Sequence, residues 1–451
     1  VPQVLHRLLL PNLTVGGLVI IVSFLIFNTY LARNAFSAPN FKKAGKKLGP
    51  VLHWNLALQL VPVTKRSILH LLSGSSFERC VRFHRWLGRW TVFLASIHAT
   101  GFLLAWNDDG ELLEKLLRTR NFYGFAAFST LLTLLLTSLS NLRRHWYNFF
   151  RVVHGFGFLF LVIFVSWHYD ADKFWAILAV PLILYVLDWV LRLYRMQRFR
   201  ILNAEVIGDD VAVRLEIPAL AHEPGQFVFV QIPSVSPFEW HPFSLCIGNS
   251  PERVALVVSQ SGDWTGRLQR MAQAGSVGDW LRVDGPFGNI GLDLDEYDSV
   301  VLVAGGAGFT PLLPILTNLQ HKFPSGSEAR RLLFVWTLKH VDLVEAYAQT
   351  LEDAAQFAVD TRVFLTQGGA GLQMASQLKG IRVGVGRPDV LAELRAEKER
   401  CLTAGVTRTA VIVSGPQSLL EASRSAVVTL NREASQEAPH EFCVHSETFE
   451  I

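Results

Sequence analysis

The sequence predicts a membrane protein in two parts: six transmembrane helices, followed by an antiparallel β-barrel joined to an open parallel α/β sheet. Long apolar spans occur only before Arg200, short alternating segments follow, and strand-like runs then alternate with helical ones. The composition agrees, because 50% hydrophobic and 18% charged residues are too apolar for a soluble enzyme and too charged for a membrane bundle alone. We place the three domains at 1–196, 197–292 and 293–451.

Six apolar spans are long enough to cross a bilayer, and they run 13–32, 48–63, 87–106, 122–139, 152–168 and 174–191. Basic residues follow the second, fourth and sixth spans, so the positive-inside rule makes those ends, and everything after Arg200, cytoplasmic. Four lysines disagree, because they fall on the outer side between the first two spans. These lysines either reach lipid headgroups or supply positive charge at the outer end of the bundle. They are Lys42, Lys43, Lys46 and Lys47.

Two histidine pairs mark the third and fifth spans: His84 with His98, and His154 with His168. Within each pair the numbers differ by fourteen, which on a helix is an advance of roughly 21 Å and a return to within about 40° of the starting face. Because the third and fifth helices run in the same direction, His84 lies level with His154 and His98 lies level with His168. Haem iron takes two axial histidines, and an intramembrane histidine is costly without a partner. The spacing therefore predicts two stacked b-type haems; the alternative is that the histidines only hydrogen-bond within the bundle.

Other residues of the bundle receive weaker assignments. Phe160, six residues after His154, is either a packing residue or a bridge between the two haem levels. His53, His70 and His145 lack a paired spacing, so we expect them at the membrane interface.

After Arg200 the pattern becomes that of a small antiparallel barrel and then of a parallel sheet. The predicted barrel strands are 211–217, 227–232, 254–259 and 280–283, punctuated by glycine and proline. The predicted parallel strands are 300–305, 332–337, 362–366 and 410–415, the last followed by a helix at 417–434.

A glycine-rich turn links the first of these parallel strands to a predicted helix. Its glycines let backbone amides approach a phosphate, and the following helix supplies partial positive charge at its first turn. Proline is suited to that first turn. The turn consists of Gly305, Gly306, Ala307, Gly308, Phe309, Thr310 and Pro311.

Two tetrapeptides of the barrel carry hydroxyls, backbone amides and aromatic rings that suit a flavin diphosphate. One lies at a predicted strand end and the other precedes a predicted helix, although each alone also occurs in ordinary turns. They are His241-Pro242-Phe243-Ser244 and Gly262-Asp263-Trp264-Thr265.

Charge and cysteine content exclude other classes of function. The formal net charge is +4 and the basic residues form no stripe, which argues against nucleic acid as a partner. The four cysteines have no CxxC spacing, so they indicate neither a zinc site nor a disulfide framework.

Together these stretches resemble the NADPH oxidase and ferric reductase superfamily along essentially the whole chain. The matching pieces, in the family's order, are LHWN at 52–55, the histidine pairs, HPFS at 241–244, GDWT at 262–265, DGPFG at 284–288, GGAGFTP at 305–311, WTLK at 336–339, GRP at 386–388 and SGP at 414–416. GDWT and DGPFG look more like the oxidase branch than the metalloreductase branch. The resemblance implies a six-helix transmembrane haem bundle followed by a ferredoxin-reductase-like module, which comprises an antiparallel FAD-binding β-barrel and an α/β NADPH-binding domain.

The resemblance also implies cofactor sites. FAD is expected at the two barrel tetrapeptides, and NADPH at the glycine-rich turn and at Gly415 and Pro416. Lys339 and Arg387 are expected to bind the ribose 2′-phosphate, because two cations suit a dianion. Phe449 is the candidate for the family's C-terminal aromatic residue that stacks on the flavin.

Three residues depart from the family pattern at places that matter for the reaction. Ser414 replaces a cysteine before Gly-Pro, so hydride transfer is expected to rely on a hydroxyl there. Lys46 replaces an arginine that lies by the outer haem in oxidases, and Phe102 replaces a histidine near their oxygen site. The latter two leave the terminal acceptor open.

The expected function is transmembrane electron transfer from cytosolic NADPH through FAD and two haems to an acceptor on the opposite side. We expect the acceptor to be O2, giving superoxide; the alternative is a ferric chelate. Two alternatives that are not enzymes are a proton channel and a structural membrane scaffold. The protein is expected to reside in a lipid bilayer, of the plasma membrane or an endomembrane, with its reductase domains in the cytoplasm.

Overall fold

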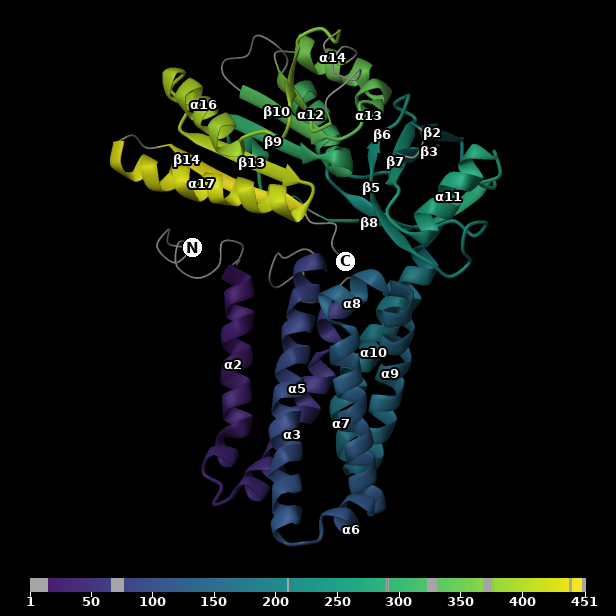
Figure 1. Ribbon diagram of the computed structural model, residues 1–451, viewed down its shortest axis with the longest axis vertical. Helices are drawn as coiled ribbons and strands as arrows, with labels where there is room; N and C mark the ends of the chain where they lie inside the picture. Colours follow the sequence, from purple (N-terminus) through teal and green to yellow (C-terminus); the bar gives the residue numbers. More distant parts are fainter. Residues whose placement is uncertain are drawn as a thin grey trace. The chain divides into compact units, whose positions relative to one another are not determined.

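The computed structural model describes residues 15–65, 77–208, 211–288, 290, 292–322, 331–357, 359–367, 375, 377–437 and 440–447 (Figure 1). The chain divides into two compact units, Val1–Tyr194 and Arg195–Ile451. The first unit is helical, and the second combines a β-barrel with a parallel sheet.

The described part of the helical unit contains six helices of at least 18 residues, one at each predicted span. Of these six, α2, α9 and α10 are long and apolar enough by composition to cross a membrane. The other three carry basic or polar residues within the helix, such as the lysines at the start of α3. The long helices are α2 (Val15–Phe36), α3 (Phe41–Leu58), α5 (Phe77–Asp108), α7 (Thr119–Thr137), α9 (Tyr147–His168) and α10 (Ala171–Arg195); η1 (Val61–Val63), α6 (Leu112–Leu117) and α8 (Ser140–His145) are short.

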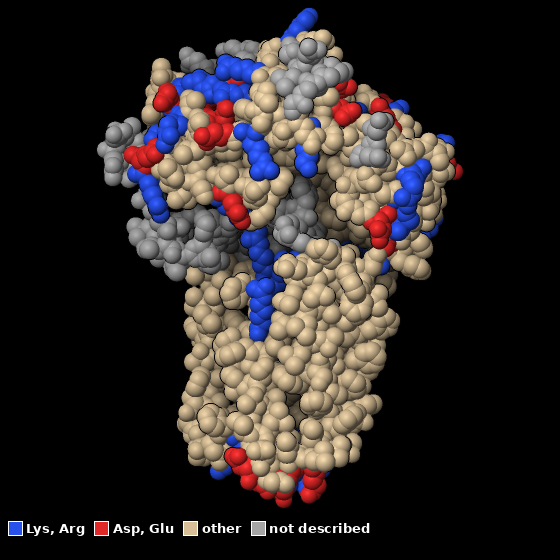
Figure 2. Space-filling view, viewed as in Figure 1, with Lys and Arg blue, Asp and Glu red and all other residues tan. Residues whose placement is uncertain are grey.

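The surface of the helical unit is largely uncharged along its length. Figure 2 shows tan side chains over most of this unit, with acidic and basic residues at the end that carries α6 and a file of basic side chains toward the other end. Many large apolar side chains of the helical unit are exposed, including Ile26 at 65% and Phe156 at 61%. Such a surface requires an apolar solvent, which the bilayer supplies.

Polar contacts and small residues fix the long helices against one another. Asn55 of α3, in the LHWN stretch, donates to Asn28 of α2 at 2.9 Å, and the Trp90 indole of α5 donates to the same amide oxygen at 3.2 Å. A Cβ on Gly101 of α5 would lie 2.6 Å from the Phe41 carbonyl oxygen, so α3 and α5 meet backbone to backbone.

Two antiparallel four-stranded sheets form the barrel around one apolar core. The strand orders are β1-β8-β4-β5 and β2-β3-β7-β6, and Val213, Leu215 and Ile217 of β3 face Val228 and Val230 of β4. The elements are β1 (Gln197–Arg200), β2 (Asn203–Ile207), β3 (Ala212–Pro218), β4 (Phe227–Gln231), β5 (His241–Ser244), β6 (Cys246–Ile247), β7 (Arg253–Ser259), α11 (Asp263–Gln273) and β8 (Trp280–Phe287).

The barrel corrects one sequence expectation. We expected His241 to Ser244 at the end of a strand, whereas these four residues are the strand β5 itself, paired antiparallel with β4. Proline within it is tolerated because β5 lies at the edge of its sheet.

A six-stranded parallel sheet forms the C-terminal domain, in the order β12-β11-β10-β9-β13-β14. Buried side chains pack on both of its faces, from α12 and α14 on one side and from α16 and α17 on the other. The elements are η2 (Leu294–Glu296), β9 (Ser299–Gly305), η3 (Gly306–Gly308), α12 (Phe309–Lys322), β10 (Arg331–Leu338), α13 (Asp342–Ala346), α14 (Ala348–Gln356), β11 (Asp360–Leu365), β12 (Ile381–Val385), α16 (Val390–Thr403), β13 (Arg408–Ser414), α17 (Gln417–Glu437) and β14 (Glu441–Glu447).

The barrel and the parallel sheet share a hydrophobic core. Ala212 of β3, Cys246 of β6 and Val257 of β7 belong to the same buried cluster as Phe309 of α12 and Trp336 of β10. The two domains of the second unit are therefore packed face to face, and their relative position is set by buried contacts.

Candidate functional site

The histidines predicted to lie at the same level of α5 and α9 face each other in the bundle. The ring centres of His84 and His154 are 6.1 Å apart, and those of His98 and His168 are 6.2 Å apart. A metal–imidazole nitrogen bond is about 2 Å long, so two imidazoles on opposite sides of one metal ion have ring centres about 6 Å apart. Both separations fit one metal ion between each pair.

Hydrogen bonds set the orientation of all four rings. Nδ1 of His98 is 2.7 Å from the Gly45 carbonyl oxygen, Nδ1 of His84 is 3.0 Å from that of Gln59, and Nδ1 of His168 is 2.9 Å from that of Arg120. Nδ1 of His154 lies 3.4 Å from the Ser138 hydroxyl. Donation from Nδ1 leaves Nε2 of each ring as the metal-binding nitrogen, which is how second partners orient metal-ligating histidines.

The carbonyl oxygens of α3 and of the residue that follows it repeat the spacing of the histidines. Gly45 and Gln59 are fourteen residues apart, as are His98 and His84, which they orient. On α7, Gly124 leaves room for the His168 ring, because a Cβ there would lie 2.5 Å from that ring. Sequence reasoning missed these supports, although small residues within apolar helices are a recognisable sign of close helix packing.

The haem expectation also agrees with the number of protein ligands. Among the described residues, no group of three or more histidine, cysteine, aspartate or glutamate side chains is placed to hold a metal ion. Haem iron takes two axial ligands from the protein, and each histidine pair supplies two imidazoles.

Three other predicted residues of the bundle lie in different surroundings. The Phe102 ring packs 5.2 Å from His98 and 5.5 Å from Trp106. Lys46 is exposed on α3, next to Gly45. Phe160 is half exposed and stacks on Phe164 at 6.1 Å.

His53 corrects an expectation, because it is buried rather than interfacial. It is 5% exposed, and its ring lies 4.0 Å from Tyr169 and 5.7 Å from Phe174. His145 is exposed, and His70 lies outside the described residues.

The barrel brings its two predicted flavin stretches together. The His241 ring lies 4.3 Å from that of Trp264, and the Phe243 ring is stacked 5.9 Å from it. Trp264 is only 4% exposed, so it supports the residues of β5 from within the barrel core. Among the described residues, its indole nitrogen and the buried Ser244 hydroxyl have no hydrogen-bond partner, which leaves both for a bound polar group.

The beginning of α11 offers a place for an anion. The Thr265 hydroxyl accepts hydrogen bonds from the backbone N–H groups of Ser261 and Gly262, each at 2.9 Å. A hollow of about 580 Å³ opens beside this turn, and Arg267 and Arg270 contribute to its lining. Backbone amides of a helix N-terminus with two nearby guanidinium groups fit a flavin diphosphate.

The glycine-rich turn lies where the order of the parallel strands reverses. From β9 the chain continues to β10 on one side, whereas β13 lies on the other side, with Ser414 opposite Ala304. Ligands of open α/β sheets bind at such a point, outside the carboxyl ends of the strands. Gly305 to Pro311 and Ser414 to Pro416 therefore come together at one edge of the sheet.

The two turns approach so closely that only glycine fits between them. A Cβ on Gly308 would lie 2.2 Å from the Ser414 carbonyl oxygen, and a Cβ on Gly305 would lie 2.6 Å from Cδ of Pro416. The Ser414 side chain is fully buried, and its hydroxyl makes no hydrogen bond to any described residue. This hydroxyl is therefore available to hydrogen-bond a ligand that enters at this edge of the sheet.

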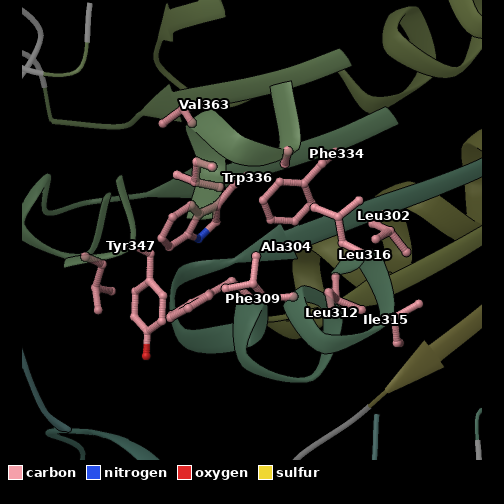
Figure 3. Close-up of a cluster of buried hydrophobic side chains, with 14 of the residues drawn as sticks. Leu302, Ala304, Phe309, Leu312, Ile315, Leu316, Phe334, Trp336, Tyr347 and Val363 are labelled. Atoms are coloured by element: carbon pink, nitrogen blue, oxygen red, sulfur yellow. The ribbon is translucent and has the colours of Figure 1, made fainter. Parts of the chain in front are cut away.

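Thr310 and Trp336 hold the turn in place. The Thr310 hydroxyl donates to the Ala307 carbonyl oxygen at 2.9 Å, and the Trp336 indole donates to that of Gly306 at 2.9 Å. Figure 3 shows Trp336 beside Phe309 in the core below the turn. Sequence reasoning quoted Trp336 as part of a family motif without giving it this role.

Lys339 and Arg387 lie at the same edge of the sheet. Lys339 follows the end of β10, Arg387 follows the end of β12, and both are exposed. Phe449 lies outside the described residues. The strand that precedes it, β14, ends with Glu447 opposite Ser414.

Models of three known families match the chain consecutively. Residues 48–165 match a ferric reductase like transmembrane component, 196–291 match an FAD-binding domain, and 297–370 match a ferric reductase NAD binding domain. The order of the three matches is that of the bundle, the barrel and the parallel sheet.

Relatives with curated names include ferric reduction oxidases and a probable ferric reductase. Ferric reduction oxidase 8, mitochondrial, of Arabidopsis thaliana is 27% identical over 72% of this chain and 47% of its own length. Probable cell surface ferric reductase kap2 of Aspergillus oryzae is 28% identical over 87% of this chain and 61% of its own length. The chain thus spans about half the length of the Arabidopsis relatives it matches.

Solved structures give weaker likenesses. A ferredoxin NADP+ reductase from Neisseria gonorrhoeae, with bound FAD and NADP, is 13% identical with a TM-score of 0.41, over 56% of this chain and 98% of that one. A flavohemoglobin from Malassezia yamatoensis with bound FAD and heme is 16% identical with a TM-score of 0.42, over 91% of this chain and 99% of that one.

Proposed function

We propose a function for this chain from one premise: it belongs to the NADPH oxidase and ferric reductase superfamily. The proposed activity is electron transfer from NADPH, through FAD and two b-type haems, to an acceptor on the opposite side of a membrane. The observation that carries the proposal is the pair of histidine contacts at 6.1 and 6.2 Å. Nδ1 of each ring faces an oxygen of α3, of α7 or of the residue that follows one of these helices.

The membrane arrangement follows from the two histidine levels. On α5 and on α9 the two histidines are fourteen residues apart, which is about 21 Å along the helix. This distance spans most of the thickness of a hydrocarbon core, which is about 30 Å. We infer that all six long helices span the bilayer. Arg192, Arg195, Arg198 and Arg200 at the end of α10 and in β1 make the following domains cytoplasmic by the positive-inside rule.

The residues of the chain place the donor and the carriers. When bound, FAD accepts a hydride from NADPH and releases electrons singly, and each haem passes one electron at a time. Gly305 to Thr310 hold the dinucleotide diphosphate, Ser414 lies where the nicotinamide enters, and Thr265 shapes the turn that binds the flavin diphosphate. His84 and His154 would hold the inner haem, which would take the electron from the flavin, and His98 and His168 would hold the outer haem, nearest the acceptor.

NADPH is the proposed donor because the residue after β10 is a cation. NADH-binding sheets usually place a carboxylate near this strand end to bind the ribose hydroxyl, whereas a cation there suits the 2′-phosphate. Here the strand is followed by Lys339 and His340, with Arg387 after β12.

Replacing Lys339 with Glu is expected to raise the KM for NADPH about tenfold or more, since a charge-assisted hydrogen bond contributes about 1.5–3 kcal/mol. The KM for NADH should change less. Steady-state dye reduction with each nucleotide measures both values. Lys379→Glu is the matched control, because Lys379 is exposed but precedes β12, at the opposite edge of the sheet; an equal rise in that variant would contradict the assignment.

For the acceptor we propose a ferric chelate. The Arabidopsis relative is named a ferric reduction oxidase and the Aspergillus relative a probable ferric reductase. Two histidine ligands would leave haem iron no open position, which suits an acceptor that takes an electron without binding the iron. One helical turn beyond His98, position 102 of α5 carries the apolar ring of Phe102, which packs against His98 and Trp106, and not an imidazole. Reduction of O2 to superoxide, expected from the oxidase-like GDWT and DGPFG stretches, is the second candidate.

An acceptor panel on the reconstituted protein tests the proposal. With NADPH as donor, we expect ferric-chelate reduction that is insensitive to superoxide dismutase and proceeds without oxygen. Cytochrome c reduction abolished by superoxide dismutase would instead favour O2. A purified sample with neither flavin colour nor haem absorbance would contradict both and favour a channel or a scaffold.

A further inference from the structure

Strand β3 of the barrel presents different residues to its two sides. Val213, Leu215 and Ile217 point into the barrel core, whereas Ala212 packs in the core shared with the parallel sheet. Arg214 and Glu216 alternate with the barrel-facing residues. They are 5% and 0% exposed, so two charged side chains are buried on the side that meets the nucleotide-binding domain.

An ion-pair network holds Arg214 in a fixed orientation. Glu216 lies 3.2 Å from Arg214 and 3.0 Å from Arg253, and it accepts a hydrogen bond of 2.9 Å from the Asn249 backbone. Arg214 also donates to the Asn249 side chain. Buried charges are costly unless their geometry is well satisfied, so this network constrains where the guanidinium group lies.

The guanidinium group of Arg214 contacts Tyr347 across the domain boundary. Its carbon lies 5.1 Å from the centre of the Tyr347 ring, within cation–π range. Tyr347 joins α13 to α14 and is 3% exposed. Burial raises the pKa of the Tyr347 hydroxyl well above its ordinary value, so the side chain stays neutral at physiological pH.

From Tyr347 a line of aromatic rings continues to the glycine-rich turn. Tyr347 meets Phe309 at 4.8 Å, Phe309 meets Trp336 at 4.6 Å, and the Trp336 indole donates to the Gly306 carbonyl oxygen. Figure 3 shows the rings of Tyr347, Phe309 and Trp336 next to one another in the buried cluster. A continuous series of contacts thus connects the flavin-binding barrel to the backbone of the dinucleotide site.

We propose that Tyr347 is a positioning residue for hydride transfer: its ring, held between Arg214 of the barrel and Phe309 of the glycine-rich turn, sets the separation of the bound flavin and nicotinamide. The inference rests on the proposed reaction, in which a hydride leaves the nicotinamide, which is oxidised, and reaches the flavin, which is reduced by two electrons. Transfer of this kind requires near-contact geometry, and a displacement of about 1 Å can cost about a hundredfold in rate.

The experiment is anaerobic stopped-flow reduction of the FAD-loaded full-length protein by NADPH. In Tyr347→Leu we expect the limiting rate of flavin reduction to fall at least about tenfold, in keeping with a displacement of under 1 Å. The FAD content and the NADPH concentration at half-maximal rate should stay within about twofold, because no proposed binding residue is changed. The absorbance of the nicotinamide–flavin charge-transfer complex should weaken in parallel.

Two further variants separate the role of the ring from general stability. Tyr347→Phe keeps the ring and removes only the hydroxyl, which faces the Cys246 thiol inside the shared core, so its rate should match that of the unmodified protein. Arg214→Lys keeps the charge but loses the planar group over the ring, and should slow reduction even if Tyr347→Leu fails to fold.

Leu351→Ala is the matched control, since Leu351 is fully buried in the same core, one turn along from Tyr347. It should lower thermal stability without slowing flavin reduction. Normal rates in both Tyr347→Leu and Arg214→Lys, or equal slowing in Leu351→Ala, would overturn the inference. If the unmodified protein itself fails to reduce flavin with NADPH, the proposed function is wrong instead.

Discussion

Replacing His98 with Leu is expected to remove one of two haems and to abolish reduction of external acceptors, while NADPH still reduces a soluble dye through the flavin. His98 is the proposed outer ligand on α5, and its ring faces His168 at 6.2 Å. Loss of even a supporting partner lowers metal affinity about 10- to 100-fold, so loss of the ligand should lower chelate reduction at least about a hundredfold. Haem content by pyridine hemochrome and the two reduction rates measure the effect.

His145→Leu is the control for this variant. His145 lies in α8 of the same unit, is exposed, and bonds only locally to the Asn141 carbonyl oxygen at 3.0 Å. It should keep both haems and full external reduction. Two haems in the His98 variant, or chelate reduction near the normal rate, would show that the electron does not leave through the outer pair.

Gly308→Ala is expected to lower NADPH-driven flavin reduction about a hundredfold, the loss that a displacement of about 1 Å can cause. The added Cβ would lie 2.2 Å from the Ser414 carbonyl oxygen and 2.9 Å from the Gly415 nitrogen. Both are backbone atoms that cannot rotate away, so the two turns of the dinucleotide site must separate. Dithionite should still reduce the flavin, because it needs no dinucleotide site.

Gly405→Ala provides the comparison in the same domain. Gly405 has a φ of +73° with open space around it, so an added Cβ there causes backbone strain without a collision. We expect a stability loss of about 1–2 kcal/mol and an unchanged rate with NADPH. Normal NADPH reduction in the Gly308 variant would contradict the dinucleotide site, whereas equal losses in both variants would point to general destabilisation.

Spacing and local sequence predicted the parts of the site that depend on one element or on neighbouring strand ends. The fourteen-residue separation of His84 and His98 places both on one face of α5, whatever the rest of the bundle does. The turn at Gly305 follows a long buried strand, and the strand's apolar run is visible in the sequence. For these features, the helical or strand period decides which side chains come together.

Features that depend on distant packing were not predictable in the same way. The carbonyl groups of Gly45 and Gln59 carry no side-chain signal, although they orient His98 and His84. Strand β5 contains a proline and β6 has two residues, so neither shows a strand pattern. The burial of Trp264 depends on how α11 crosses the barrel, which no local pattern shows.

The core shared by the barrel and the parallel sheet has a consequence for folding. The predicted boundary between 292 and 293 separates two topologies, but the buried cluster that contains Ala212, Cys246 and Phe309 crosses it. Removing either domain would expose an apolar face of the other to water. We therefore expect residues 195–451 to unfold as a single cooperative unit, with one calorimetric transition. A barrel expressed alone, without its partner sheet, should aggregate.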